Sequence, residues 1–318
     1  MAGAVSREAA ETSEEWKKPG NGKKHLMQAT LIGFSAILMW SLLALLTALS
    51  GEVPPFQLAA MCFSVATAVG LVSLAAKPSG FRNLRQPLHI WCLGVGGLFG
   101  YHFFYFTALR NAPAVEASLI GYLWPLLIVV GSALLPGERL DWHHVTGALA
   151  GLGGTVLIVS KNGLSFDDSF ALGYGAALLS AFTWAAYSLL SRRFGTVPTD
   201  TVTGFCAVTA VFSLVCHLAL EQTVWPHGAG QWLAVSGLGL LPVGAAFYAW
   251  DFGVKHGDIR VLGTASYAAP LLSTLILVAS GVGQADWRIA CACVLITGGA
   301  VLAAKDMLSL RTRRGQAS

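Results

Sequence analysis

Charged residues are scarce in this sequence: they make up 11% of its 318 residues, whereas hydrophobic residues make up 55% and the mean hydropathy is +0.63. A soluble domain contains roughly 25% charged residues, so this chain could not cover a globule of its size with polar surface. The composition argues against a soluble enzyme, a nucleic-acid-binding protein and a disordered chain. It leaves a helical membrane protein, the class in which apolar stretches of about 20 residues recur.

Motifs for disulfides and metal centres are also missing. All six cysteines lie inside apolar segments, where we expect small packing residues rather than disulfide partners. The sequence contains no CxxC pair and no HExxH motif. We therefore expect no structural or catalytic metal and no cofactor.

What the sequence does contain is a series of long apolar runs. Residues 1–27 are polar and are expected to form a disordered cytoplasmic tail, and residues 306–318 a basic one. The first apolar run is about 22 residues long, which is too long for a cleavable signal peptide. Ten runs are expected to span the membrane as helices, in an all-α polytopic protein: 29–50, 55–76, 88–109, 112–136, 144–160, 171–191, 201–220, 231–253, 259–281 and 287–304.

The basic residues predict the orientation of these spans. If the N-terminus is cytoplasmic, 17 of the 20 Lys and Arg residues fall on the cytoplasmic side, and only Arg110, Lys161 and Arg288 fall outside. This asymmetry is typical of cytoplasmic loops. It predicts a multi-pass membrane protein with both termini in the cytoplasm. Because the cytoplasmic loops and tails account for the net charge of +4, we expect no nucleic acid as a partner.

A repeated pattern links the two halves of the chain. At an offset of 144 residues, seven of the 23 positions from 40 to 62 are identical, including Trp40 with Trp184. At an offset of 145, ten of the 36 positions from 122 to 157 are identical. Chance identity in so biased a composition is roughly one in ten, so the sequence predicts two copies of one unit.

Each copy, at residues 28–162 and 170–305, contains five spans. Because five is odd, the second copy must cross the membrane in the opposite direction. Such inverted repeats are typical of secondary transporters, whose substrate site lies near the midplane between the halves. A structural duplication without transport is the alternative.

The fifth run contains Gly147 and Gly151, four residues apart. Small residues at this spacing allow two helix backbones to approach closely. We interpret both as packing glycines.

Several features together resemble a known family. The ten spans, the five-plus-five repeat, the short loops and a tryptophan midway along the first helix of each half (Trp40 and Trp184) resemble the EamA-type exporters of the drug/metabolite transporter superfamily, over about residues 29–305. The stretch from Ala114 to Pro125 is similar to the fourth helix of the bacterial aromatic amino-acid exporters in that superfamily. The resemblance implies export of aromatic and other neutral amino acids across the inner membrane, without an ATP-binding domain.

Prolines and aromatic residues inside the spans indicate where a substrate would bind. A proline within a helix frees a backbone carbonyl, which in lipid must be satisfied by protein or by cavity water. Buried Tyr and Trp side chains need a partner for their polar group, and an aromatic chamber suits an apolar molecule with a small zwitterionic end. Plain packing in the bundle core is the alternative for each residue. The predicted substrate-binding residues are Trp40, Tyr101, His102, Tyr105, Tyr122, Trp124, Pro125, Trp184, Tyr187, Tyr248, Tyr267 and Pro270.

Few ionisable residues lie inside the spans, and such residues are functional candidates. His102 shares a helix face with two tyrosines and could bind a carboxylate or carry a proton. Glu116 could take part in coupling or could be an acidic residue that the helix dipole favours in a first turn. We interpret His217 as structural, and we expect Asp251 to pair with Lys255 four residues away.

The predicted mechanism is alternating access, in which the two halves of a monomer rock about one midplane site within the lipid bilayer. Proton antiport and facilitated diffusion both remain open. Another small amphipathic metabolite or a cationic drug is the alternative substrate. An intramembrane enzyme is disfavoured because the sequence has no HExxH, no pair of mid-membrane aspartates and no GxSG motif, and a channel because no filter-like loop is repeated.

Overall fold

The computed structural model describes residues 21–78, 80–160, 163–164, 166–281 and 286–306. Residues 1–20 and 307–318 of the two predicted tails lie outside the described residues. Residues 21–27, which the sequence assigned to the first tail, instead form the start of a helix. The described part of the chain consists of helices and their connections and contains no strand.

The helices of the first half are α2 (Asn21–Trp40), α3 (Leu43–Leu49), α4 (Pro55–Ala75), η1 (Gly80–Leu84), α5 (Leu88–Val95), η2 (Gly96–Gly100), α6 (Tyr101–Asn111), α7 (Ala114–Gly121), α8 (Trp124–Gly131), η3 (Ser132–Leu134) and α9 (Trp142–Val159). Those of the second half are η4 (Asp168–Phe170), α10 (Ala171–Arg193), η5 (Thr199–Thr201), α11 (Val202–Leu220), α12 (Gly228–Leu240), η6 (Leu241–Ala245), α13 (Ala246–His256), α14 (Ile259–Ala265), α15 (Ala268–Ala279) and α16 (Trp287–Ala303).

These helices join into the expected membrane spans. Among the described residues, nine helical stretches are long and apolar enough to cross a bilayer, and α16 is a shorter apolar helix. Their ends agree with the predicted runs to within three residues, except that the first begins earlier, at Gly22. We call the face at which α2 begins the inner face, after the orientation that the basic residues predict, and the opposite face the outer face.

The two halves repeat each other helix by helix. The third span of the first half changes from α-helix to one wide π turn at η2 and continues as α6, and the eighth span does the same at η6 before α13. Both π turns contain five residues and lie 145 positions apart. The fourth and ninth spans also break at equivalent places, Tyr122 and Tyr267. The halves therefore form a five-plus-five inverted repeat.

One element departs from this symmetry. The first span is interrupted at Ser41 and Leu42, between α2 and α3. Its equivalent α10 runs without interruption through 23 residues.

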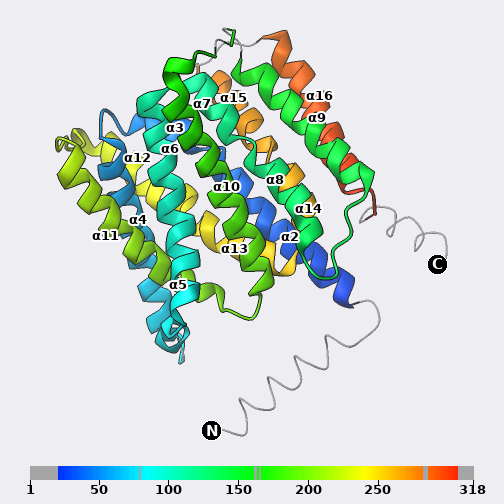
Figure 1. Ribbon diagram of the computed structural model, residues 1–318. Coiled ribbons are helices and arrows are strands. Elements are labelled where there is room, and N and C mark those ends of the chain that lie inside the picture. Colours follow the sequence, from blue (N-terminus) through cyan, green and yellow to red (C-terminus); the bar gives the residue numbers. More distant parts are fainter. Residues whose placement is uncertain (1–20, 79, 161–162, 165, 282–285, 307–318) are drawn as a thin grey trace, which may run out of the picture.

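The packing of helices follows the repeat (Figure 1). Helix α2 packs on α13 and, equivalently, α10 packs on α6. The partners α4 and α11 lie together on the left of the view with α12, and α9 and α16 lie side by side on the right. Helices α2, α8, α10, α13 and α14 fill the middle.

Glycines allow the closest of these contacts. A Cβ atom on Gly147 would lie 2.5 Å from the carbonyl oxygen of Gly299, and the reverse approach is equally tight. Gly33 of α2 and Gly253 of α13 meet in the same way. The sequence-based interpretation of Gly147 as a packing residue agrees with this contact between α9 and α16.

Polar contacts close the ends of α4 and α11 at both faces. On the outer face the carboxylate of Glu221, after α11, accepts hydrogen bonds of 3.1 Å from the backbone amides of Phe56 and Gln57 at the start of α4. It also binds Arg110 at 2.6 Å and His217 at 3.0 Å. Glu221 thus caps a helix N-terminus, where a negative charge is favourable, and His217 has the structural role that the sequence suggested.

The inner face has the equivalent arrangement with opposite charges. Lys77, which follows α4 and is equivalent to Glu221, pairs at 2.6 Å with Asp200 of η5. Thus two faces that are related by the repeat are closed by different ion pairs.

Candidate functional site

Aromatic rings from both halves meet in the middle of the bundle. We define the aromatic cluster as the six rings of Trp40 (α2), Tyr101 (α6), Trp124 (α8), Trp184 (α10), Phe247 and Trp250 (α13). Four of them, Trp40, Tyr101, Trp124 and Trp184, are predicted substrate-site residues. The structure therefore brings together the part of the prediction that concerned the tryptophans.

Trp184 is the hub of the cluster. Its ring centroid lies 5.7 Å from that of Trp40, 5.5 Å from Tyr101 and 6.4 Å from Trp124. Most of these contacts are tilted or edge-to-face, the geometry that aromatic quadrupoles favour. Trp184 is 3% exposed and Trp250 is fully buried, so these two rings are enclosed by protein.

The indole of Trp40 also makes a polar contact across the two halves. Its Nε1 donates a 3.1 Å hydrogen bond to the backbone carbonyl of Pro242. Pro242 lies in the π turn η6, where the helical hydrogen-bond pattern is altered. The contact fixes the ring orientation of Trp40 and joins α2 to the eighth span.

Tyr101, Tyr105 and His102 of α6 extend the cluster. The rings of Tyr101 and Tyr105 are parallel at a centroid distance of 5.9 Å, and the Tyr105 hydroxyl lies 3.3 Å from the hydroxyl of Ser118 in α7. His102 Nδ1 donates to the carbonyl of Leu98 at 2.7 Å, because a carbonyl can only accept. In the neutral form of the ring, Nε2 of His102 is then the acceptor atom.

Three other predicted residues lie in the fourth span: two of them at its break and the third in its first turn. Tyr122 lies in the turn between α7 and α8, close enough to Tyr105 to interact with it electrostatically. Pro125 is buried at the start of α8, and its carbonyl faces Gly263 of α14. Glu116 is buried in the first turn of α7.

Three predicted residues are not brought to the cluster. Tyr248 follows Phe247 directly, and successive side chains of a helix point about 100° apart. Tyr248 therefore faces α11, where its hydroxyl lies 2.9 Å from the hydroxyl of Thr203. Tyr267 is buried against Gly151 of α9 in a separate apolar cluster. Pro270 is buried in α15, one turn after Tyr267.

Sequence reasoning left Phe247 and Trp250 out of the site. Both rings lie within 6.3 Å of Trp40. Their spacing of three residues places them on one face of α13, and this spacing was the signal that could have found them.

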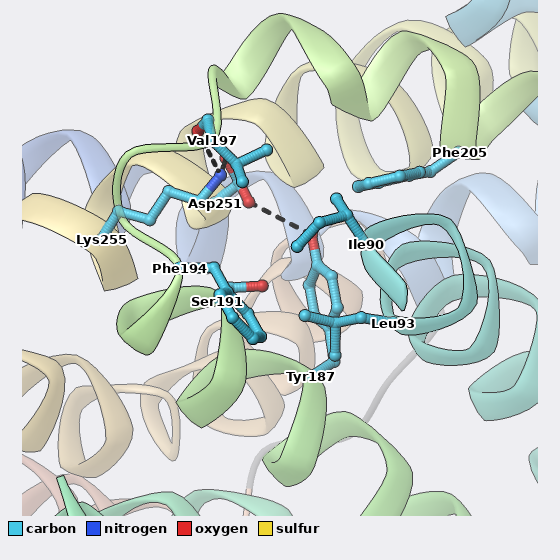
Figure 2. A pocket seen from close by; sticks show the side chains of 9 residues that line it. All are labelled: Ile90, Leu93, Tyr187, Ser191, Phe194, Val197, Phe205, Asp251 and Lys255. Carbon is cyan, nitrogen blue, oxygen red and sulfur yellow. Dashed lines mark hydrogen bonds and ion pairs between the residues drawn. The ribbon is translucent and has the colours of Figure 1, made fainter. Parts of the chain in front are cut away.

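A small pocket lies on the inner side of the aromatic cluster, between α5, α10, α11 and α13 (Figure 2). Its polar residues are Asp251, Lys255, Ser191 and Tyr187, and it has room for about one water molecule. Asp251 and Lys255 form the expected ion pair at 2.7 Å, and their side chains are 1% and 4% exposed. The pocket is lined by Ile90, Leu93, Tyr187, Ser191, Phe194, Val197, Phe205, Asp251 and Lys255.

One group of possible metal ligands is present at the inner end of α9. Ligand atoms of Asp141, His143 and His144 lie within 4.8 Å of one another. Asp141 and His144 are already engaged in a capping box, in which the Asp141 amide donates to His144 Nδ1 at 3.2 Å. We assign these residues to the start of the helix.

Comparisons with known proteins agree with this architecture. The model of the EamA-like transporter family matches the chain twice, at residues 27–160 and 171–304. The chain is 54% identical over 277 residues to "Aromatic amino acid exporter YddG" of Ancylobacter novellus, which covers 86% of this chain and 96% of the relative. It is 27% identical to the exporter of the same name from Escherichia coli, over 91% of this chain and 99% of the relative.

A solved crystal structure is also similar. Its sequence is 54% identical, the TM-score is 0.84, and the match covers 87% of this chain and 97% of the other.

Proposed function

Because the chain belongs to the EamA-like transporter family, we propose that it exports aromatic and other neutral amino acids across the bacterial inner membrane. The observation that carries the substrate class is the aromatic cluster, which both halves build at their interface. The relative from Ancylobacter novellus, which is 54% identical, is an aromatic amino acid exporter by name, which supports the aromatic part of this substrate class. Ring–ring contacts of about 0.5–1.5 kcal/mol each favour an aromatic side chain there.

The proposed substrate site is the aromatic cluster together with Tyr105, His102 and Tyr122. Trp faces attract an ammonium group, and His102 Nε2 can accept a hydrogen bond. Tyr248, Tyr267 and Pro270 are assigned to packing in the conformation described here.

Alternating access is the proposed mechanism. In this conformation the inner ends of α10 and α13 are held together: Arg192 donates to the carbonyls of Lys255 and Gly257 at 3.0 and 2.6 Å, and Trp250 donates to Ser188 at 3.0 Å. A substrate from the cytoplasm needs these ends to separate. The paired π turns η2 and η6 and the breaks at Tyr122 and Tyr267 are the proposed bending points, because such irregular turns occur where helices move.

Transport in proteoliposomes tests the proposal. We expect purified protein to support counterflow of labelled phenylalanine against internal phenylalanine, at rates well above those of empty liposomes. A pH gradient that raises steady accumulation would identify proton antiport, with His102 or Glu116 as the proposed coupling residue. Equal accumulation with and without the gradient would identify facilitated diffusion, and no counterflow of any neutral amino acid would contradict the proposed function.

The orientation in the membrane has its own test. Glu52 and Thr196 occupy equivalent positions after the first spans of the two halves. We expect Glu52→Cys to react with an impermeant maleimide in intact cells and Thr196→Cys to react only in inside-out vesicles, in a background where the four cysteines that are not buried are serine. The reverse labelling would contradict cytoplasmic termini.

Another amphipathic metabolite is the second candidate substrate. The chain is also 24% identical, over 92% of its length, to "Pseudopaline exporter CntI" of Pseudomonas aeruginosa. Competition of a panel of metabolites and cationic drugs with phenylalanine in the counterflow assay separates the two substrate classes.

A further inference from the structure

The ion pair of Asp251 and Lys255 is an unusual element of a membrane-spanning helix. Burying two charges costs several kcal/mol per ion, and well-packed apolar residues often stabilise a core equally well. Ionisable residues inside a span therefore indicate a functional site.

The inverted repeat does not require this pair. Arg110 stands at the position equivalent to Lys255, but the position equivalent to Asp251 is Phe106. Arg110 instead reaches Glu221, the residue directly after α11. The pair within α13 is therefore particular to the second half of the chain, where it lies toward the inner face.

The pocket around the pair has two chemically distinct parts (Figure 2). Phe194, Phe205 and the ring of Tyr187 form an apolar wall, and Asp251 and Lys255 form a charged corner. An aromatic amino acid has the same two parts: a ring, and an ammonium beside a carboxylate.

Each bond that Asp251 and Lys255 make in this conformation could be replaced by a bond to the ammonium or the carboxylate of an amino acid. Asp251 accepts from Thr199 at 2.7 Å, from Lys255 at 2.7 Å and, more weakly, from Tyr187 at 3.4 Å. An ammonium group can donate to Asp251 in their place. Lys255 also donates to the carbonyl of Val197 at 3.0 Å, and a carboxylate is a stronger acceptor for it.

We propose that Asp251 and Lys255 bind the zwitterionic head group of the amino acid as it enters from the inner face. Asp251 binds the ammonium group, Lys255 binds the carboxylate, and the substrate ring lies against the wall of Tyr187, Phe194 and Phe205. This inference rests on the proposed export of amino acids and specifies where their charged end is first recognised, before the substrate reaches the aromatic cluster.

The pocket also leads toward the aromatic cluster. The ring of Tyr187 lies 5.2 Å from that of Trp184, and Asp251 directly follows Trp250. Because the pocket has room for only about one water molecule in this conformation, the head group can bind only after the connection from Phe194 to Pro198 moves away. The bonds from Lys255 to Val197 and from Thr199 to Asp251 hold that connection in place. A head group that replaces both bonds releases it, so binding and opening are linked.

Three solutes separate the two charges: phenylalanine, phenethylamine, which lacks the carboxylate, and 3-phenylpropionate, which lacks the ammonium. We expect the wild-type protein in proteoliposomes to prefer phenylalanine over both analogues as inhibitors of phenylalanine counterflow. Lys255→Gln is expected to weaken inhibition by phenylalanine about tenfold or more and to change inhibition by phenethylamine little. Asp251→Asn is likewise expected to weaken inhibition by phenylalanine and to change inhibition by 3-phenylpropionate little. Both effects are large because hydrogen bonds to charged groups are stronger than those between neutral groups.

The decisive variant is Asp251→Asn/Lys255→Gln, which leaves no uncompensated buried charge. We expect this double variant to be made and folded but to lose the preference for the zwitterion. Lys77→Gln, which removes a pair at the same face outside the pocket, is the matched control and should keep the preference. A double variant that still prefers phenylalanine to both analogues overturns this inference alone, whereas a wild type without any counterflow overturns the proposed function as well.

A second measurement covers the case in which the double variant does not fold. Ser191→Cys places a thiol in the pocket, in the same background of four serines. We expect phenylalanine to slow its labelling in inside-out vesicles and phenethylamine to slow it much less. Labelling that phenylalanine leaves unchanged overturns the inference.

Discussion

Replacing Trp184 by alanine is expected to reduce phenylalanine counterflow by about two- to twelvefold. The ring of Trp184 contacts those of Trp40, Tyr101, Trp124 and Trp250 within 6.4 Å. Each contact contributes about 0.5–1.5 kcal/mol. A substrate ring that contacts Trp184 in place of one of these partners would lose a comparable binding energy in the alanine variant. Counterflow rates normalised to the amount of purified protein measure the effect.

Two variants separate binding from folding in this experiment. Trp→Ala changes in a core cost about 3–5 kcal/mol of stability, so Trp184→Phe, which keeps a ring, should retain expression and part of the activity. Phe182→Ala, on the exposed side of the same helix, should be nearly silent. We also expect Tyr105→Ala to reduce counterflow, and full activity in both alanine variants would show that the aromatic cluster is packing only.

The second large effect is expected from Gly147→Val. The new Cβ would lie 2.5 Å from the backbone carbonyl of Gly299, and backbone cannot move aside as a flexible side chain can. Overpacking of this kind costs about 1–3 kcal/mol or more. We expect the melting temperature of the purified protein in detergent to fall by roughly 5 °C or more.

The matched control is Gly153→Val in the same helix. A Cβ atom on Gly153 would have no neighbour within 4 Å, while the change in helix propensity is the same. Equal melting temperatures for the two variants would contradict the proposed role of Gly147 in packing α9 on α16.

The fold was predictable because it depends on periodic properties. Apolar length predicted the spans, and the identities at offsets of 144 and 145 predicted the two halves and their inversion. The resemblance to the EamA-type exporters is confirmed by the double match of the family model. The early start of α2 was missed because the basic residues Lys23 and Lys24 resemble a tail, although they can extend a helix beyond the hydrocarbon layer.

The site was predictable only in part, because which face of a helix meets its neighbours depends on packing. Depth in the membrane identified Trp40 and Trp184, but it also selected Tyr248, which lies on another face of α13 from Phe247 and Trp250. Tyr267 shares its position in the repeat with Tyr122, yet it faces Gly151. The bond from Trp40 to Pro242 joins residues 202 positions apart, and no local pattern predicts such a contact.

The interruption at Ser41 and Leu42 gives the two halves unequal stiffness. The uninterrupted α10 can move as one rigid helix, whereas α3 can change its angle to α2 by bending at the interruption. In the proposed alternating-access cycle, the first helices of the two halves would therefore contribute unequally to the motion. We expect the inward-facing and outward-facing forms of the empty protein to differ in lifetime.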